Sequence, residues 1–133
     1  EYFVSCYQYV NNLKVWRGDL FFYFDKNGRF EGLLGDIISA IDTGTSPSMG
    51  VSEVEARFLG RMKDDSFYSN SKSVANGCMT CELVYYDQAK MGGGSTPDYV
   101  LAWLVKPEKS DYPVALVNDS NQLVEYYNNG VIF

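Results

Sequence analysis

Short apolar blocks separated by polar turns fill the first 40 residues of the chain. Residues 3–10 have the aromatic and β-branched content of a strand, and the Asn11-Asn12 pair that follows is a turn signal. Polar residues 25–28 form a second turn signal, ending in a glycine. The pattern therefore predicts a meander of antiparallel strands at 3–10, from Lys14, at 20–24 and at 29–35.

The strand predicted at 20–24 is the most apolar of the four. Its sequence is Leu-Phe-Phe-Tyr-Phe, and such a continuous run indicates a strand that is covered on both faces or lies at a sheet centre. The turn after it, Asp25-Lys26-Asn27-Gly28, resembles the start of a calcium loop. It lacks a third acidic ligand and a closing Glu, so a β-turn is predicted instead.

A helical period replaces the strand period after a polar connector at 42–50. Apolar residues then recur at helical spacing and predict one stripe facing a sheet: Val54, Phe58, Leu59 and Met62. Ser52 and Glu55 have the spacing of a capping box, and Val51 can pack on the first turn. The predicted helix runs from 53 to 63.

Strand signals return in the second half, after an irregular stretch at 66–77. Apolar blocks predict strands at 80–86, 98–106, 113–117 and 122–127, and the glycine-rich residues 91–95 predict a hairpin tip. The expected fold class is α+β, with antiparallel sheet packed on one main helix. At 133 residues, the chain suits one domain or two small half-domains that share a core.

Composition excludes several classes of function. The chain has 17 acidic and 11 basic residues, a net charge of −6, which disfavours binding to nucleic acid and to anionic membranes. No apolar run approaches the ~20 residues that cross a bilayer, so no membrane insertion is predicted.

The chain contains no histidine at all. Catalytic triads that use histidine, Cys-His pairs and histidine-based zinc sites are therefore excluded. The sequence predicts no catalytic residues, no metal ligands and no cofactor. Should the chain nevertheless be an enzyme of unrecognised type, Glu53 and Asp65 are its candidate carboxylates.

Three cysteines leave several arrangements open. Cys78 and Cys81 form a CxxC that runs into a strand pattern rather than the helix of a thioredoxin-like redox site. A disulfide between Cys78 and Cys81, inert thiols, and a pairing of Cys6 with one of them are all compatible with the sequence. Redox or metal chemistry is the remaining alternative.

The first part of the chain resembles the FTP segment in propeptides of thermolysin-like and fungalysin metalloproteases. That segment has a glutamine, a short turn, a Val-aromatic pair, a strand and an Asp-x-x-Gly turn. The residues that match it are Gln8, Val15, Trp16, Leu20, Asp25 and Gly28.

The second part resembles the PepSY domain that follows in those propeptides. Ser52-x-x-Glu55-Ala56 matches its helix start, and residues 82–86 and 101–105 match two of its strands. Residues 117–122 lie where the family has a Val-Asp-Ala-x-Thr-Gly turn, and they lack its glycine. The resemblance implies a PepSY/cystatin-like architecture, with an FTP-like meander at 1–42 and a PepSY-like part at 48–133 forming one continuous globular unit.

The resemblance also implies a role. Such a chain would be a non-catalytic inhibitor and intramolecular chaperone whose partner is a secreted, thermolysin-like protease. It would be secreted or extracytoplasmic, with its signal peptide outside this sequence. Tyr126 and Tyr127, near the end that leads toward the enzyme in such precursors, are the candidate interface residues.

Two further functions stay open at this point. A standalone extracytoplasmic PepSY-like domain could bind or regulate a protein partner without being part of a precursor. An enzyme of unrecognised type is disfavoured because the chain lacks the usual catalytic side chains.

Overall fold

The computed structural model of the chain describes residues 1–68 and 77–132, so most of the stretch predicted as irregular at 66–77 lies outside the described residues. The chain divides into two units. Unit 1 comprises 1–45 and 85–99, and unit 2 comprises 46–84 and 100–133. The division near residue 45 falls between the two parts expected from the sequence, and residues 85–99 belong to the unit of the N-terminal meander.

The described residues form an α+β structure with nine strands in two sheets and one main helix. One sheet has three strands in the order β1-β4-β5, and the other has six in the order β2-β3-β6-β7-β8-β9. Every strand pair with a described register is antiparallel. The α+β class expected from the sequence is therefore confirmed.

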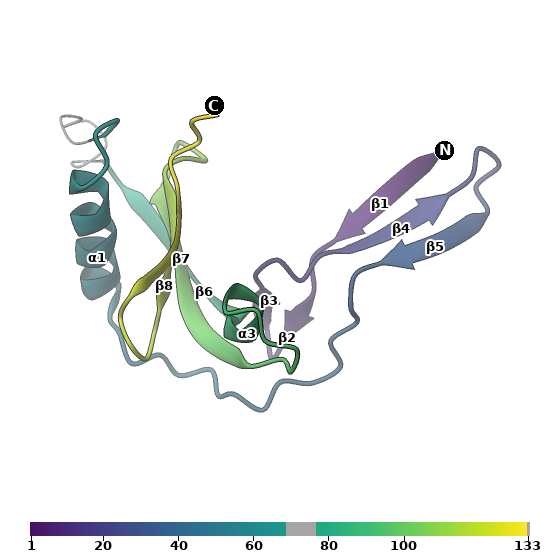
Figure 1. Cartoon of the computed structure of the whole chain (residues 1–133), viewed down its shortest axis with the longest axis horizontal. Helices are drawn as coiled ribbons and strands as arrows, with labels where there is room; N and C mark the ends of the chain where they lie inside the picture. Colours follow the sequence, from purple (N-terminus) through teal and green to yellow (C-terminus); the bar gives the residue numbers. More distant parts are fainter. Residues whose placement is uncertain (69–76, 133) are drawn as a thin grey trace. The chain divides into compact units, whose positions relative to one another are not determined.

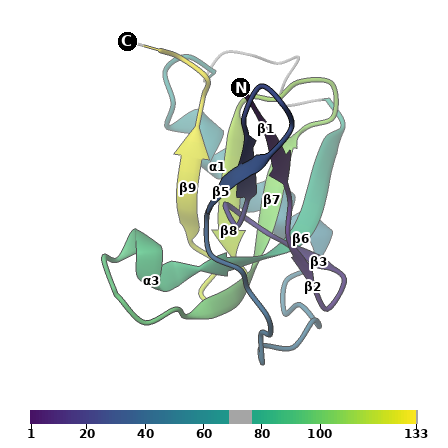
Figure 2. The same cartoon turned by 90° about the vertical axis from the view of Figure 1, so that its right-hand side faces the viewer.

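Unit 1 is built around the three-stranded sheet (Figures 1 and 2). It consists of β1 (Tyr2–Cys6), β4 (Leu20–Phe24) and β5 (Phe30–Leu34), with β4 between the other two. The prediction that the apolar run at 20–24 lies at a sheet centre is confirmed. The turn between β4 and β5 closes as expected, since Asp25 Oδ1 accepts the N–H groups of Asn27 and Arg29 and Gly28 has a φ of 79°.

Unit 1 also contains a small hairpin, β2 (Tyr9–Val10) and β3 (Leu13–Val15). Its two-residue turn is Asn11-Asn12, with φ angles of 51° and 67°. Both residues are thus left-handed, as the tightest hairpin turns require, and asparagine tolerates this conformation better than most residues. The turn signal in the sequence is confirmed.

Two polar side chains fasten the loops of unit 1. Gln8 Nε2 donates to the carbonyl oxygens of Gly18 and Asp36 at 2.7 and 2.8 Å, while its Oε1 accepts the N–H of Ile38 at 3.0 Å. The buried Tyr85 hydroxyl donates to the carbonyl of Thr43 at 2.7 Å. The Gln8 side chain therefore ties its own segment to the segments around Gly18 and around residues 36–38.

Unit 2 packs one helix against sheet strands. The helix is α1 (Val51–Lys63), and the strands are β8 (Val114–Asn118), β9 (Val124–Asn128) and most of β6 (Met79–Asp87) and β7 (Tyr99–Pro107). The helix runs alongside these strands in Figure 1. The core of buried residues consists of Met49, Val54, Phe58, Met62, Trp103, Val105, Ala115 and Val117. The predicted stripe at Val54, Phe58 and Met62 is fully buried, and Leu59 packs at its margin.

Two local predictions are wrong. The helix begins at Val51 with Gly50 as its N-cap and has no side-chain cap, so Ser52 and Glu55 lie inside the first turns and form no capping box. The strand predicted at 3–10 is divided, because β1 belongs to one sheet and β2 to the other. The glycine-rich residues 91–95 do lie in the connection between the neighbouring strands β6 and β7, after a short helix, α3 (Gln88–Met91), which Asp87 caps by accepting the N–H of Ala89. Within the described residues, no helix has the length and apolar character needed to cross a membrane.

The turn between β8 and β9 contains a residue in a costly conformation. Gln122, the residue after Asn121 in this turn, has a φ of 63°. A left-handed conformation costs a residue other than glycine about 1–2 kcal/mol. Gln122 also accepts an exposed hydrogen bond from Arg57 at 2.8 Å, which offsets a small part of that cost.

Replacing Gln122 with glycine is therefore expected to raise the free energy of unfolding by about 1 kcal/mol, because glycine adopts this conformation without strain. Urea denaturation followed by circular dichroism measures the change. Gln122→Ala is the matched control: it removes the same hydrogen bond, keeps the strain and should not stabilise. Equal stability of the two variants would contradict the prediction.

Candidate protein-binding surface

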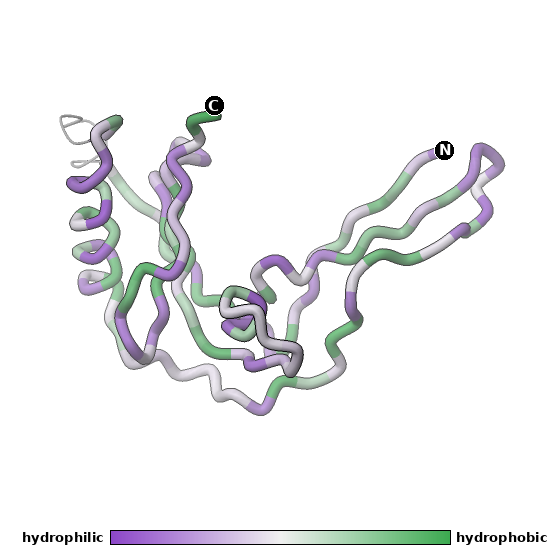
Figure 3. Tube along the Cα trace, viewed as in Figure 1, coloured by the Kyte–Doolittle hydropathy of each residue, from purple (hydrophilic) through white to green (hydrophobic). Residues whose placement is uncertain are grey.

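The strongest surface feature of unit 1 is the sheet β1-β4-β5, named here the aromatic sheet. All five residues of β1 are exposed. Large apolar side chains stay in solvent on all three strands, among them Tyr2 at 52% exposed, Phe3 at 59% and Phe30 at 60%. Figure 3 shows the hydrophobic positions that follow one another along these strands.

The aromatic sheet is apolar on both of its faces. Because side chains alternate along a strand and the register pairs Tyr2 with Phe24 and Phe3 with Tyr23, the two faces can be assigned. One face has Tyr2, Val4, Phe22, Phe24, Phe30 and Leu33, and the other has Phe3, Phe21, Tyr23 and Leu34. An antiparallel sheet usually packs one face on a core and shows a polar face to water. In the aromatic sheet, by contrast, neither face is polar, and both faces leave large apolar side chains in water.

Ring contacts hold the side chains of each face together. Tyr2 stacks on Phe24 with ring centroids 5.2 Å apart, and on the other face Phe3 lies 6.0 Å from Phe21 and 5.8 Å from Tyr23. The aromatic rings are therefore arranged before any partner binds, which lowers the entropy lost on association. A rigid aromatic patch of this kind is typical of binding hot spots.

The exposed area of the aromatic sheet is large for its size. An aromatic side chain buries about 150–250 Å² when covered, and several here leave half or more of that area in water. Together they expose roughly a few hundred Å² of apolar surface, divided between the two faces of the sheet, and exposed apolar patches of this order mark interaction sites. The sequence signal for this surface was the continuous apolar run at 20–24, which indicates a covered strand without saying what covers it.

The structure places the two candidate interface residues on opposite faces of β9. The Tyr127 side chain packs against the core of unit 2, its hydroxyl donates to Asp65 Oδ2 at 2.8 Å, and the Arg61 guanidinium lies 4.1 Å from its ring. Tyr126 accepts a hydrogen bond from Asn128 at 3.0 Å. Both side chains are half-buried. Tyr127 thus has a structural role between strand and helix.

The candidate carboxylates also have different surroundings. Burial raises the pKa of Asp65, but hydrogen bonds from Tyr127, from the N–H of Phe67 and from Asn129 outweigh it, so the pKa lies below its usual value. Burial, and then the hydrogen bond to Asp65, raises the pKa of Tyr127 well above that of a free tyrosine. Asp65 is therefore an ionised acceptor that ties residues 127 and 129 to the end of α1. Glu53 lies in the first turn of that helix.

All three cysteines are free thiols in the structure. Cys81 lies in β6 and Cys78 comes just before it, so three residues of extended chain separate their Cα atoms by about 10 Å. A disulfide needs Cα atoms within about 7 Å, so joining the two would require a bend in this strand. Burial, and then the nearby Glu55, raises the pKa of the Cys81 thiol and lowers its reactivity.

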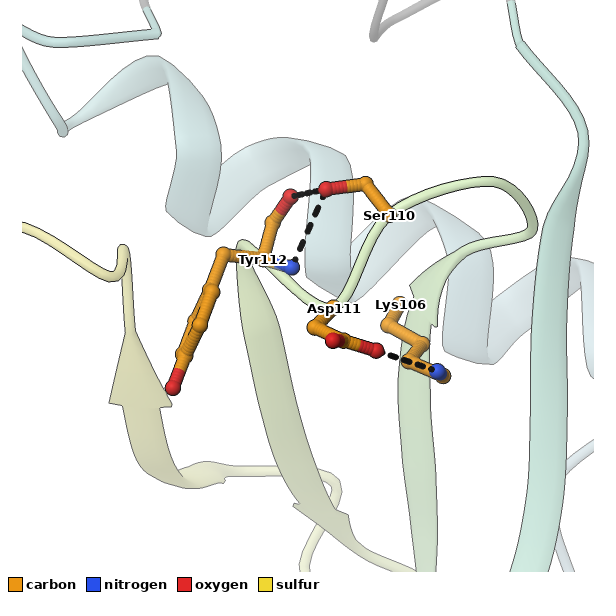
Figure 4. A network of polar contacts seen from close by, with 4 residues as sticks. All are labelled: Lys106, Ser110, Asp111 and Tyr112. Carbon is orange, nitrogen blue, oxygen red and sulfur yellow. Dashed lines mark hydrogen bonds and ion pairs between the residues drawn. The ribbon is translucent and has the colours of Figure 1, made fainter.

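A cavity of about 420 Å³ in unit 2 is lined in part by the loop from β7 to β8. Figure 4 shows how that loop is held: Ser110 Oγ donates to the Tyr112 carbonyl at 2.8 Å, and Lys106 pairs with Asp111 at 3.3 Å. The N–H of Glu108 in the same loop donates to the Cys78 carbonyl at 2.8 Å, so the loop is also tied to the start of β6. Among residues 1–68 and 77–132, no group of three Cys, Asp or Glu side chains is placed to hold a metal ion.

Comparison of the chain with protein-family models, with curated proteins and with solved structures finds no significant match.

Proposed function

We propose that this chain is a non-catalytic, propeptide-like module that binds a secreted metalloprotease, assists its folding and inhibits it. The observation that supports this proposal is the aromatic sheet, which leaves apolar side chains of both faces in water. A surface of this kind lowers its free energy by binding a protein with exposed apolar area, such as an enzyme that is completing its fold.

The motif residues add to this proposal. Gln8 fastens three segments of unit 1, and Asp25 with Gly28 closes the turn between β4 and β5. Both features hold the aromatic sheet and the loops beside it in one conformation. Residues that match the FTP segment thus help to shape the proposed binding surface. The net charge of −6 would favour encounter with a partner that presents basic surface.

Inhibition tests this proposal. The purified chain is added to thermolysin-like and fungalysin proteases encoded in the same genome, and cleavage of a short fluorogenic peptide is measured at rising concentrations of the chain. The recovery of protease activity after dilution from denaturant is measured in parallel. We expect saturable inhibition and a higher refolding yield, because the module binds the native enzyme in preference to its unfolded state.

Leu34 and Leu123 offer a matched pair of variants, since they are 59% and 60% exposed and lose the same side chain on substitution. Leu34→Ser lies on the aromatic sheet and should weaken inhibition about tenfold, the value of one well-covered apolar anchor of about 1.4 kcal/mol. Leu123→Ser lies before β9 and should leave inhibition unchanged. If every such protease stays uninhibited and refolds no better, the proposal fails. Binding without inhibition would favour a standalone extracytoplasmic binding domain.

A further inference from the structure

The outer edge of β1 lacks the devices that usually protect a strand edge. Within the described residues, β1 pairs only with β4, so the other edge of the strand offers its backbone groups to solvent. Its residues Tyr2–Cys6 include no charged residue and no proline, and the pairing with β4 is regular along the whole strand. A regular, apolar and exposed edge is a template for the addition of another strand.

The opposite edge of the same sheet is protected. In β5 the register with β4 shifts between Tyr23 and Phe24, so that Glu31 is an extra residue opposite no partner. A bulge of this kind bends the edge strand, and its carboxylate has to be desolvated before another strand can pair there. The two edges of the aromatic sheet therefore differ, and only β1 is ready for strand addition.

We propose that β1 pairs with β1 of a second copy of this chain, antiparallel and about a two-fold axis at Val4. This register places Val4 opposite Val4 of the second copy, Phe3 opposite Ser5, and Tyr2 opposite Cys6. Side chains of each face then meet side chains of the same face, because a two-fold axis perpendicular to a sheet preserves its faces. The product is one six-stranded sheet in which both apolar faces continue across the axis.

Charge supports a second copy as the occupant of this edge. The strand itself has no charge, so no like charges face each other across the axis. Continued by one residue at each end, the register brings Glu1 next to Tyr7 of the second copy. The Lys14 ammonium lies 5.0 Å from the Tyr7 ring, so the Glu1 carboxylate approaches a positive charge at both ends of the paired strands.

Thiol cross-linking tests the register. Val4→Cys is made in a background of Cys6→Ser and Cys78→Ser, which removes the two exposed thiols. Residues directly opposite in an antiparallel pair have Cα atoms about 4.5–5.5 Å apart, within the range of a disulfide. In a glutathione redox buffer, two thiols form the bond and glutathione disulfide is reduced. We expect at least tenfold more linked dimer than for Leu34→Cys, the matched control on the protected edge.

Sedimentation of the unmodified chain tests the association itself. The mass should rise with concentration from 15.0 kDa toward twice that value. Val4→Lys sets two ammonium groups opposite each other and should keep the chain monomeric, whereas Leu34→Lys should still dimerise; circular dichroism checks that both variants fold. A chain that stays monomeric at all concentrations, or equal linking of Val4→Cys and Leu34→Cys, overturns the inference. Neither experiment contains a protease, so its failure is distinct from failure of the proposed function.

Discussion

Replacing Asp119 with alanine is expected to lower the free energy of unfolding by about 3–5 kcal/mol. The Asp119 carboxylate is 4% exposed and accepts three hydrogen bonds, from the N–H groups of Ser48 and Met49 at 2.7 and 2.9 Å and from the Trp103 indole at 3.3 Å. Alanine leaves the buried donors of Met49 and Trp103 without an acceptor, whereas the N–H of Ser48, an exposed residue, can bond to water. Each unsatisfied buried donor costs about 1–3 kcal/mol.

The expected loss is large because Asp119 joins three parts of unit 2. It lies after β8, Trp103 lies in β7, and residues 48 and 49 lead into α1. The N-cap of α1, Gly50, supplies no side-chain hydrogen bond, so the carboxylate fixes the entrance to a helix that has no cap of its own. Loss of Asp119 should therefore loosen the packing of the helix as well as the turn.

Urea denaturation measures the effect, and Asp111→Ala provides the control. Asp111 pairs with Lys106 at 3.3 Å, but its side chain is 87% exposed, so its removal should change stability by about 0.5 kcal/mol or less. Asp119→Asn keeps an acceptor and the shape of the side chain, and it should fall between the other two variants. A loss below about 1 kcal/mol for Asp119→Ala would show that water replaces the carboxylate.

The elements of this fold could be predicted where a local pattern decides them. Residues 20–24 form the strand that their continuous apolar run predicts, and Asn11-Asn12 forms the predicted turn because both residues accept a positive φ. The helix stripe at Val54, Phe58 and Met62 became the core of unit 2. These signals lie within a few residues of the structure they specify.

The parts that the sequence did not predict depend on distant residues or on very short segments. Asp119 is joined by hydrogen bonds to residues about 70 positions away, and no local pattern marks such a partner. The capping-box spacing at Ser52 and Glu55 was misleading, because the helix begins at Val51, two residues earlier than predicted. The four residues of α3 are too few for a helical period to appear.

The candidate binding surface could not be predicted from the sequence, for a different reason. An apolar run predicts that something covers a strand, and the same pattern results whether the cover is part of the chain or another molecule. The run at 20–24 therefore gave the correct strand and the correct place in the sheet, yet it gave no sign that neighbours such as Phe3 and Phe30 stay in water. Only the structure separates the aromatic residues that form a core from those that remain exposed.

Replacing a buried and an exposed phenylalanine with alanine is expected to have very different effects on the free energy of unfolding. Phe58→Ala should lower the free energy of unfolding by about 3–5 kcal/mol, because Phe58 is fully buried between α1 and the sheet of unit 2 and its loss leaves a cavity. Phe30→Ala should cost about 1 kcal/mol or less. Phe30 is 60% exposed, and its ring lies 6.5 Å from that of Phe22 and 6.0 Å from that of Phe24, measured between centroids.

Denaturation measures the free energy of unfolding of both variants. Protease inhibition by both variants then shows whether the exposed ring of Phe30 contributes to binding. A phenylalanine that contributes little to folding is expected to contribute to binding if the aromatic sheet is the interface, so Phe30→Ala should inhibit about tenfold less well while remaining folded. Phe58→Ala should inhibit normally in the fraction that stays folded. A Phe30→Ala chain as unstable as Phe58→Ala would mean that the aromatic sheet is part of the folding core, and the case for a partner on it would fall.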